Sequence, residues 1–311
     1  VDIMSDTKQK CFKYLGMEAG ATSIKVAYVD AANRRVLRTA VLETQTSPLD
    51  DIYTLEENFQ KWMDENEIKE FDAVSITVPA FRSVIRQVFV PPEASKNLDD
   101  YLQWYITTIT NAKPGDYLLT FQIMSGDERL GYTVMLIAAR REWVDNVRKG
   151  FRNKDLAPKA FDVDVLSLMN LLDYAEKVTE LECVVKADYA GVILMWMVKD
   201  SLQALRCIST LDLSNKSTEE AYQILAGKIK NQIRLAQEEN AAIVTKNVRL
   251  CGDMAVDISF VETLRKNLDG CQLSLMDSFS NMRLPVEAED SAVVLSCSAA
   301  IGAALNVMEG V

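Results

Sequence analysis

The chain has 311 residues, which is enough for two hydrophobic cores, because single cores stop growing at roughly 250 residues. Hydrophobic residues make up 49% and charged residues 25%, a composition that is typical of globular proteins and excludes general disorder. The formal net charge of -11, without any stripe of Lys and Arg, argues against nucleic acid as a partner. The chain contains no histidine, which excludes histidine-based triads and general bases and most zinc sites.

The six cysteines are scattered without a C-x-x-C pair, which is typical of a reducing, cytosolic compartment. No run reaches the roughly 18 apolar residues that a bilayer span needs. The most apolar stretch, residues 293–308, is interrupted by Ser296, Ser298 and Asn306, and it predicts a buried helix. We expect a cytoplasmic protein that contacts a membrane only through a partner.

Residues 11–80 have the pattern of three strands, a helix and a fourth strand. The strands are expected at 11–17, 23–30, 35–43 and 73–78, with a glycine-containing turn at 19–22. The helix is expected to start at a capping box formed by Thr54 and Glu57.

The same order returns after residue 181. Strands are expected at 182–188, 192–198, 202–208 and 247–251. The helix between the last two begins at a second capping box, Ser217 and Glu220. The repeat predicts a duplicated α/β fold, with two unrelated α+β domains as the alternative.

Residues between the two halves predict an inserted α+β subdomain. A helix with one apolar side is expected within 92–111, strands at 117–123 and 131–139, and a further helix around 143–151. Residues 163–178 are apolar on most sides, which predicts a buried helix that links the two lobes. We divide the chain into a first lobe at 11–80, the inserted subdomain at 81–158, and the linking helix and second lobe at 159–311, with a small subdomain at about 212–246.

The first hairpin carries groups suited to phosphate. Glycines permit the turn at Gly16 and Gly20, hydroxyls follow, a lysine supplies a cation, and Glu18 would face Mg²⁺ through water. The candidate nucleotide-binding residues are Glu18, Gly20, Ala21, Thr22, Ser23 and Lys25. A plain β-hairpin whose glycine makes the turn is the alternative.

A duplication of this order, with each half opening on a hairpin, resembles the actin, Hsp70 and sugar-kinase superfamily, which has the ribonuclease H-like fold. The first hairpin resembles its phosphate loop, Asp-x-Gly-(Ser/Thr)-x-x-(Lys/Arg), with Glu18 in place of Asp and with Ala21 where a hydroxyl is expected. The resemblance implies ATP and Mg²⁺ as cofactors, with Glu18 and Asp188 facing the metal through water. In the second hairpin Asp188 matches the pattern, whereas Ala190 adds a Cβ and no hydroxyl follows.

The adenosine loop of that superfamily resembles residues 250–255, where Gly252 fits and Asp253 departs from the pattern. We expect Asp253, together with Asp257, to mark the start of the following helix. The departures in both loops predict weakened or lost ATP binding and no efficient catalysis.

Five stretches resemble the PilM family of type IV pilus assembly proteins, which are relatives of FtsA. They are residues 15–30, 84–106, 138–172, 248–255 and 298–308, in the order expected for that family. The resemblance implies an actin-like scaffold that holds the N-terminal tail of a PilN-like inner-membrane protein beside the inserted subdomain. The residues that would form this groove are Arg82, Arg86 and Trp104, although helical aromatic side chains more often pack in a core.

Three other functions stay open at this point. The cytoplasmic domain of the type II secretion protein GspL has a similar architecture, and an active FtsA-like ATPase is a second alternative. A phosphotransferase of the sugar-kinase branch needs an acidic general base, for which Asp162 and Asp164 are the candidates. A homo-oligomer is possible, and the pattern does not decide it.

Overall fold

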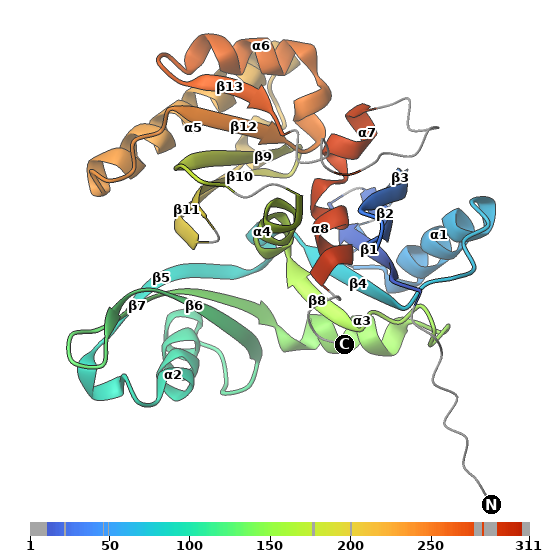
Figure 1. The fold of residues 1–311 in the computed structure, drawn as a ribbon, viewed down its shortest axis with the longest axis horizontal. Helices are drawn as coiled ribbons and strands as arrows, with labels where there is room; N and C mark the ends of the chain where they lie inside the picture. Colours follow the sequence, from blue (N-terminus) through green and yellow to red (C-terminus); the bar gives the residue numbers. More distant parts are fainter. Residues whose placement is uncertain are drawn as a thin grey trace, which may run out of the picture.

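The computed structural model describes residues 11–21, 23–45, 47–48, 50–175, 178–199, 201–276, 282 and 291–306. Two five-stranded sheets form the two lobes (Figure 1). The first has the order β3-β2-β1-β4-β8, with β1 Lys13–Ala19, β2 Ser23–Asp30, β3 Arg35–Glu43, β4 Ala73–Val78 and β8 Ala160–Val163. The second has the order β11-β10-β9-β12-β13, with β9 Glu182–Asp188, β10 Gly191–Val198, β11 Ser201–Ser209, β12 Asn247–Cys251 and β13 Gln272–Leu275.

The two sheets have the same topology, as the repeat predicts. In each lobe three antiparallel strands come first, the fourth strand pairs in parallel with the first, and the fifth pairs in parallel with the fourth. The crossover helices α1 Ile52–Glu65 and α5 Thr218–Glu239 each stand between the third and fourth strands. The predicted α/β duplication is confirmed.

Of the two predicted capping boxes, the one at α5 is present and the one at α1 is not. The side chain of Ser217 accepts a hydrogen bond from the backbone of Glu220, so α5 begins at the expected cap. Helix α1 begins earlier than expected, because Asp51 caps it instead. Its carboxylate accepts hydrogen bonds from the backbone N–H of Thr54 at 3.1 Å and from the Thr54 hydroxyl at 2.6 Å.

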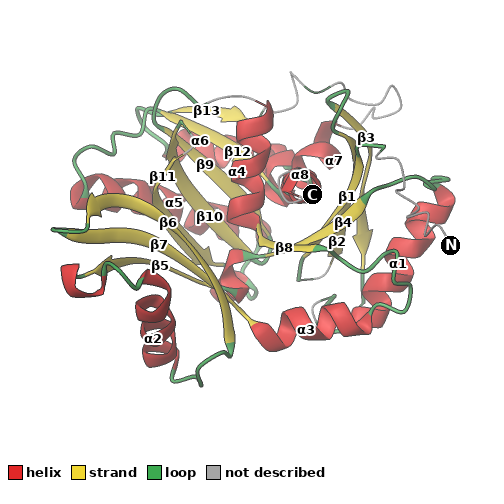
Figure 2. Cartoon of the chain, turned by 60° about the horizontal axis from the view of Figure 1, so that its bottom comes forward, coloured by secondary structure: helices red, strands yellow, loops and turns green. Residues whose placement is uncertain are grey.

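The inserted part contains a three-stranded sheet with the order β5-β7-β6, so that β5 and β6 are its edge strands. Its elements are β5 Val84–Val90, α2 Leu98–Thr110, β6 Tyr117–Asp127, β7 Gly131–Arg140 and α3 Arg141–Gly150. Helix α2 packs on one side of this sheet (Figure 2) and forms a small core with it. Helix α3 contacts α1 and therefore lies against the first lobe.

Two helices, α4 Asp164–Ala175 and α8 Ser298–Asn306, pack against each other between the two large sheets (Figure 1). Helix α8 also contacts β1, β2 and β4. Strand β8 and helix α8 therefore join the first lobe, although both fall within the range 159–311 that we expected to form the linking helix and second lobe. Of the subdomain expected at about 212–246, helix α5 packs into the core of the second sheet.

Gly16 lies inside β1 and not at the turn, which corrects the role expected for it. A Cβ built on Gly16 would lie 1.9 Å from the carbonyl oxygen of Ala300 in α8. The missing side chain thus lets α8 approach the first sheet.

Candidate functional site

A cavity of about 750 Å³ opens between the two lobes. Both hairpins line it, together with the segment that follows β11, the start of α5 and the short helix η4 Asp253–Val256. Apolar side chains form much of its wall, among them Val41, Phe81, Leu213, Tyr222 and Met254. A volume of this size is ordinary for a small-molecule site.

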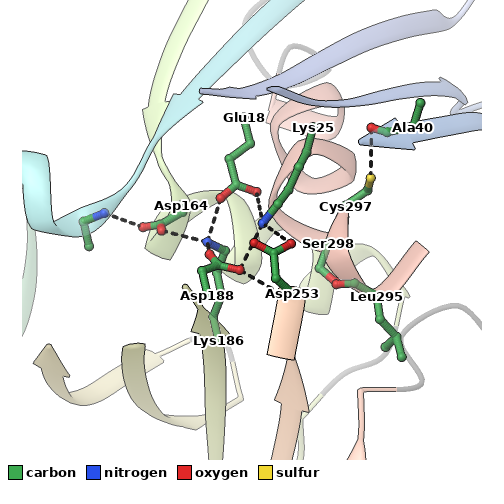
Figure 3. Close-up of polar contacts among 11 residues, drawn as sticks. Glu18, Lys25, Ala40, Asp164, Lys186, Asp188, Asp253, Leu295, Cys297 and Ser298 are labelled. Atoms are coloured by element: carbon green, nitrogen blue, oxygen red, sulfur yellow. Dashed lines mark hydrogen bonds and ion pairs between the residues drawn. The ribbon is translucent and has the colours of Figure 1, made fainter. Parts of the chain in front are cut away.

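Two buried lysines from different lobes lie close together beside this cavity (Figure 3), and Lys25 is the one that lines it. Lys25 comes from β2 and Lys186 from β9, and each side chain is 2% exposed. A charge buried to this degree is costly unless opposite charges and hydrogen bonds compensate it. The surrounding carboxylates supply that compensation.

Lys186 is held by three carboxylates. Its Nζ lies 2.6 Å from Oε1 of Glu18 and 3.3 Å from Oδ2 of Asp164, and it also donates to Oδ2 of Asp188. The other oxygen of Asp164 accepts a hydrogen bond from the backbone N–H of Ala80 at 2.9 Å. These contacts connect β1, α4 and β9.

Lys25 makes a second set of contacts across the cleft. Its Nζ lies 3.0 Å from Oδ1 of Asp188, 3.0 Å from Oδ1 of Asp253 and 3.8 Å from Oε2 of Glu18. The backbone N–H of Asp253 also donates to Asp188 at 3.0 Å. The six side chains that form this ion cluster are Glu18, Lys25, Asp164, Lys186, Asp188 and Asp253.

The lysines stay charged in this environment. Burial alone would lower the pKa of Lys186, but Asp188, Glu18 and Asp164 together raise it well above its ordinary value. The pKa of Lys25 is raised in the same way, because Asp188 and Glu18 outweigh the effect of burial. Although burial opposes ionisation of Asp188, Lys186 and Lys25 hold its pKa well below the usual range.

Two other carboxyl groups of the cluster are protonated more easily than usual. Burial raises the pKa of Asp164 to about 7, although Lys186 opposes the rise. Burial and the charge of Asp188 raise the pKa of Asp253 to about 6. Four carboxyl and two ammonium groups would carry a formal charge of -2 if all were ionised, and these raised pKa values reduce it.

The cluster does not fit the Mg-ATP site that the superfamily resemblance implies. Glu18 and Asp188, the residues expected to face Mg²⁺, have the ammonium group of Lys186 between them. Lys25, expected to meet phosphate, is instead paired with Asp188 and Asp253, whose carboxylates repel an anion. Within the described ranges, no group of three or more Asp, Glu or Cys residues is placed to hold a metal ion.

Some of the remaining predicted nucleotide-binding residues line the cavity. Gly20, Ala21 and Ser23 line it, and the N–H of Gly20 donates to the carbonyl of Ser23 at 2.9 Å. Thr22 lies outside the described residues. Gly252 has a φ of 92°, and a Cβ there would lie 2.8 Å from Oδ1 of Asp188, so glycine permits the close approach.

The two acidic residues that follow β12, Asp253 and Asp257, have different roles. Asp257 caps α6 Ile258–Asn267 by accepting hydrogen bonds from the N–H groups of Ser259 and Phe260, as predicted. Asp253 is the first residue of the short helix η4, which precedes α6, and its side chain pairs with Lys25 and does not cap α6.

Lys186 was absent from the predicted site. It stands inside the apolar strand β9, and its burial of 98% places it among the largest fully buried side chains of the described structure. A lysine at an inward position of a buried strand is the signal that would have indicated it.

The candidate partner residues lie on three elements. Arg82 ends the short helix η1 Ala80–Arg82 and lies 4.0 Å from Asp50. Arg86 is exposed on the edge strand β5, and Trp104 is 56% exposed on α2, where its ring lies 5.4 Å from that of Tyr101.

The chain has the actin-like ATPase fold. It matches a protein of that fold and of unknown function from Bacteroides thetaiotaomicron with a TM-score of 0.51 and 11% identity, over 88% of this chain and 94% of that chain. No family model matches the chain, and no curated protein does.

The similarity extends to a particular assembly. The structure of a PilM–PilN type IV pilus biogenesis complex matches with a TM-score of 0.74 and 18% identity, over 94% of this chain and 98% of that chain. The cytoplasmic domain of EpsL, an inner-membrane component of the type II secretion system of Vibrio cholerae, matches with a TM-score of 0.52 and 13% identity. This match covers 92% of this chain and 93% of that chain. The expected resemblance to PilM is confirmed at the level of the fold.

A structure with this fold also contains a nucleotide analogue. The activator of 2-hydroxyisocaproyl-CoA dehydratase from Clostridium difficile, with bound ADPNP, matches with a TM-score of 0.52 and 8% identity, over 96% of this chain and 95% of that chain.

Among the helices that the structure describes, none has the length and apolar character needed to cross a bilayer.

Replacing Asp253 by asparagine is expected to flatten part of the pH dependence of stability. In the folded state the pKa of Asp253 is raised from 3.8 to about 6, so folding takes up protons in this window and stability falls as the pH rises through it. An asparagine stays neutral, and the variant should gain about 1 kcal/mol relative to the wild type between pH 5 and pH 8. Urea denaturation at both pH values measures this difference. An equal pH dependence in the two proteins would contradict the assignment.

Proposed function

We propose that this protein is a cytoplasmic actin-like scaffold of a type IV pilus or a related secretion machine. It binds the N-terminal tail of a PilN-like inner-membrane protein and is held at the membrane through that partner. The observation that carries the proposal is the match to the PilM–PilN complex over 94% of this chain, at a TM-score of 0.74 against 0.51 to 0.52 for the other three structures. The inserted sheet, with its exposed edge strand, supports the same conclusion.

The tail would dock along β5, because an edge strand offers free backbone groups to an extended peptide. Exposed side chains lie on this strand and on α2. Phe89 of β5 is 58% exposed, Arg86 lies on the same strand, and Trp104 projects from the helix that packs beneath the sheet. Aromatic and arginine side chains are enriched among residues that anchor a partner.

Alanine at Arg82, Arg86 or Trp104 is expected to weaken binding of a synthetic PilN-like tail peptide about tenfold, the loss typical of an anchor residue. Isothermal titration with each purified variant measures the change. Arg234 on α5 is a matched control, because it is 59% exposed on the second lobe and its replacement should leave binding unchanged. Unchanged binding in all three variants would exclude this surface as the docking site.

Nucleotide binding in this scaffold is weakened or lost. The ion cluster at the two hairpins supports this, because a phosphate group that bound there would have to displace paired lysines from their carboxylates. We expect Mg-ATP to give no saturable heat in calorimetry and no shift in melting temperature. Submicromolar binding with hydrolysis would overturn this part of the proposal and favour an active ATPase.

A phosphotransferase is less well supported, because neither candidate base lines the cavity. Asp164 pairs with Lys186, and Asp162 accepts hydrogen bonds from Ser167 and Asn306. A role in type II secretion in place of pilus assembly is supported by the EpsL match. Comparing the binding of tail peptides from a pilus system and from a type II secretion system would separate these two roles.

A further inference from the structure

The ammonium group of Lys186 has the surroundings of a bound cation. Three carboxylate oxygens face its Nζ, from Glu18 at 2.6 Å, from Asp164 at 3.3 Å and from Asp188. An ammonium group has three N–H donors, so one is available for each carboxylate. Glu18 and Asp164 are each 1% exposed, which leaves water little access to the site.

The carboxylates come from separate parts of the chain. Glu18 lies on β1 in the first sheet, Asp188 lies on β9 in the second, and Asp164 begins α4 between them. Figure 3 shows the three carboxylates converging on the end of the Lys186 side chain. Carboxylate oxygens are the ligands that Mg²⁺ and Mn²⁺ prefer. With the ammonium group of Lys186 among them, these three carboxylates form no metal site in the described structure, and without any cation between them they would repel one another.

We propose that the ammonium group of Lys186 occupies the position of a divalent cation between the lobes, so that the lobes are held together without a metal ion. The cation is part of the chain and does not dissociate. Lys25 reinforces the link, because it reaches from β2 to Asp188 and Asp253 on the second lobe. This proposal concerns the cleft alone and stands whether or not the tail peptide binds.

If the ammonium group of Lys186 and a divalent metal ion occupy the same position, removing the ammonium group should allow the metal ion to bind there. Wild-type protein should melt at the same temperature in EDTA and in millimolar MnCl₂. Lys186→Ala should melt several degrees lower in EDTA, and MnCl₂ should restore part of the loss, because the space left by the side chain lies between three carboxylates. Titration followed by Mn²⁺ electron paramagnetic resonance should detect a bound ion in this variant and none in the wild type.

Two controls make the test specific. Glu18→Gln added to Lys186→Ala should abolish the rescue by MnCl₂, because it removes one ligand charge. Lys61→Ala, on the exposed face of α1, should neither lower the melting temperature nor respond to MnCl₂. If Lys186→Ala is recovered unfolded, its refolding from urea with and without MnCl₂ gives the same comparison.

Three results would overturn the proposal. They are stabilisation of the wild type by MnCl₂, a Lys186→Ala variant as stable as the wild type in EDTA, and a destabilised variant that MnCl₂ neither stabilises nor helps to refold.

Discussion

Replacement of Lys25 by methionine is expected to lower the free energy of unfolding by about 3–5 kcal/mol, the loss typical of breaking a buried ion pair. The side chain is 2% exposed and its Nζ lies 3.0 Å from both Asp188 and Asp253. Without the ammonium group these carboxylates would face each other and Glu18 with less compensation. Methionine keeps most of the apolar length of lysine, so the loss would report the missing charge and not a cavity. Urea denaturation at pH 8, where the carboxyl groups are most fully ionised, measures it.

The matched control is Lys61→Met on α1. Lys61 is 74% exposed and pairs with Glu65 at 3.8 Å, so its replacement should change stability by less than about 0.5 kcal/mol. Adding Asp253→Asn to Lys25→Met should recover part of the loss, because it removes one of the uncompensated charges. A loss below about 1 kcal/mol for Lys25→Met would mean that the cluster contributes little to stability.

The strands of both lobes could be predicted because their signals are local. Strands β2, β3, β4, β9 and β12 have the bounds that their apolar and β-branched residues indicate. Strands β8 and β13 were missed, since each has four residues and its pairing depends on a neighbour far away in the chain. Likewise, the lobe to which α8 belongs follows from its contacts with β1 and not from its sequence.

The candidate site could be predicted in part for the same reason. Glu18, Lys25, Asp188 and Asp253 stand at hairpins and strand ends, where the resemblance to phosphate loops indicates them. What the pattern could not give is their partners. Lys186 and Glu18 are 168 positions apart, and the choice between holding a phosphate and pairing with each other depends on how the lobes meet.

Gly16 shows how one residue type can be interpreted in two ways. A glycine beside a predicted turn indicates backbone freedom, yet at Gly16 the requirement is space for the backbone of α8. Gly302 has the same role from the other side, on α8 itself. A Cβ at Gly302 would lie 1.8 Å from the carbonyl oxygen of Ser167 in α4, so close packing of the two central helices depends on it.

Gly302→Ala should therefore lower the free energy of unfolding by about 3 kcal/mol, the upper end of the usual cost of overpacking, because the clash is with backbone that cannot rotate away. The control is the same substitution at Gly227, which lies in α5 and has open space at its Cβ position. There alanine should stabilise by about 0.5–1 kcal/mol through its higher helix propensity. Urea denaturation of both variants compares one chemical change in two environments. If Gly302→Ala proved as stable as Gly227→Ala, the two central helices would have to be able to move apart without cost, and close packing of α4 on α8 would not depend on this glycine.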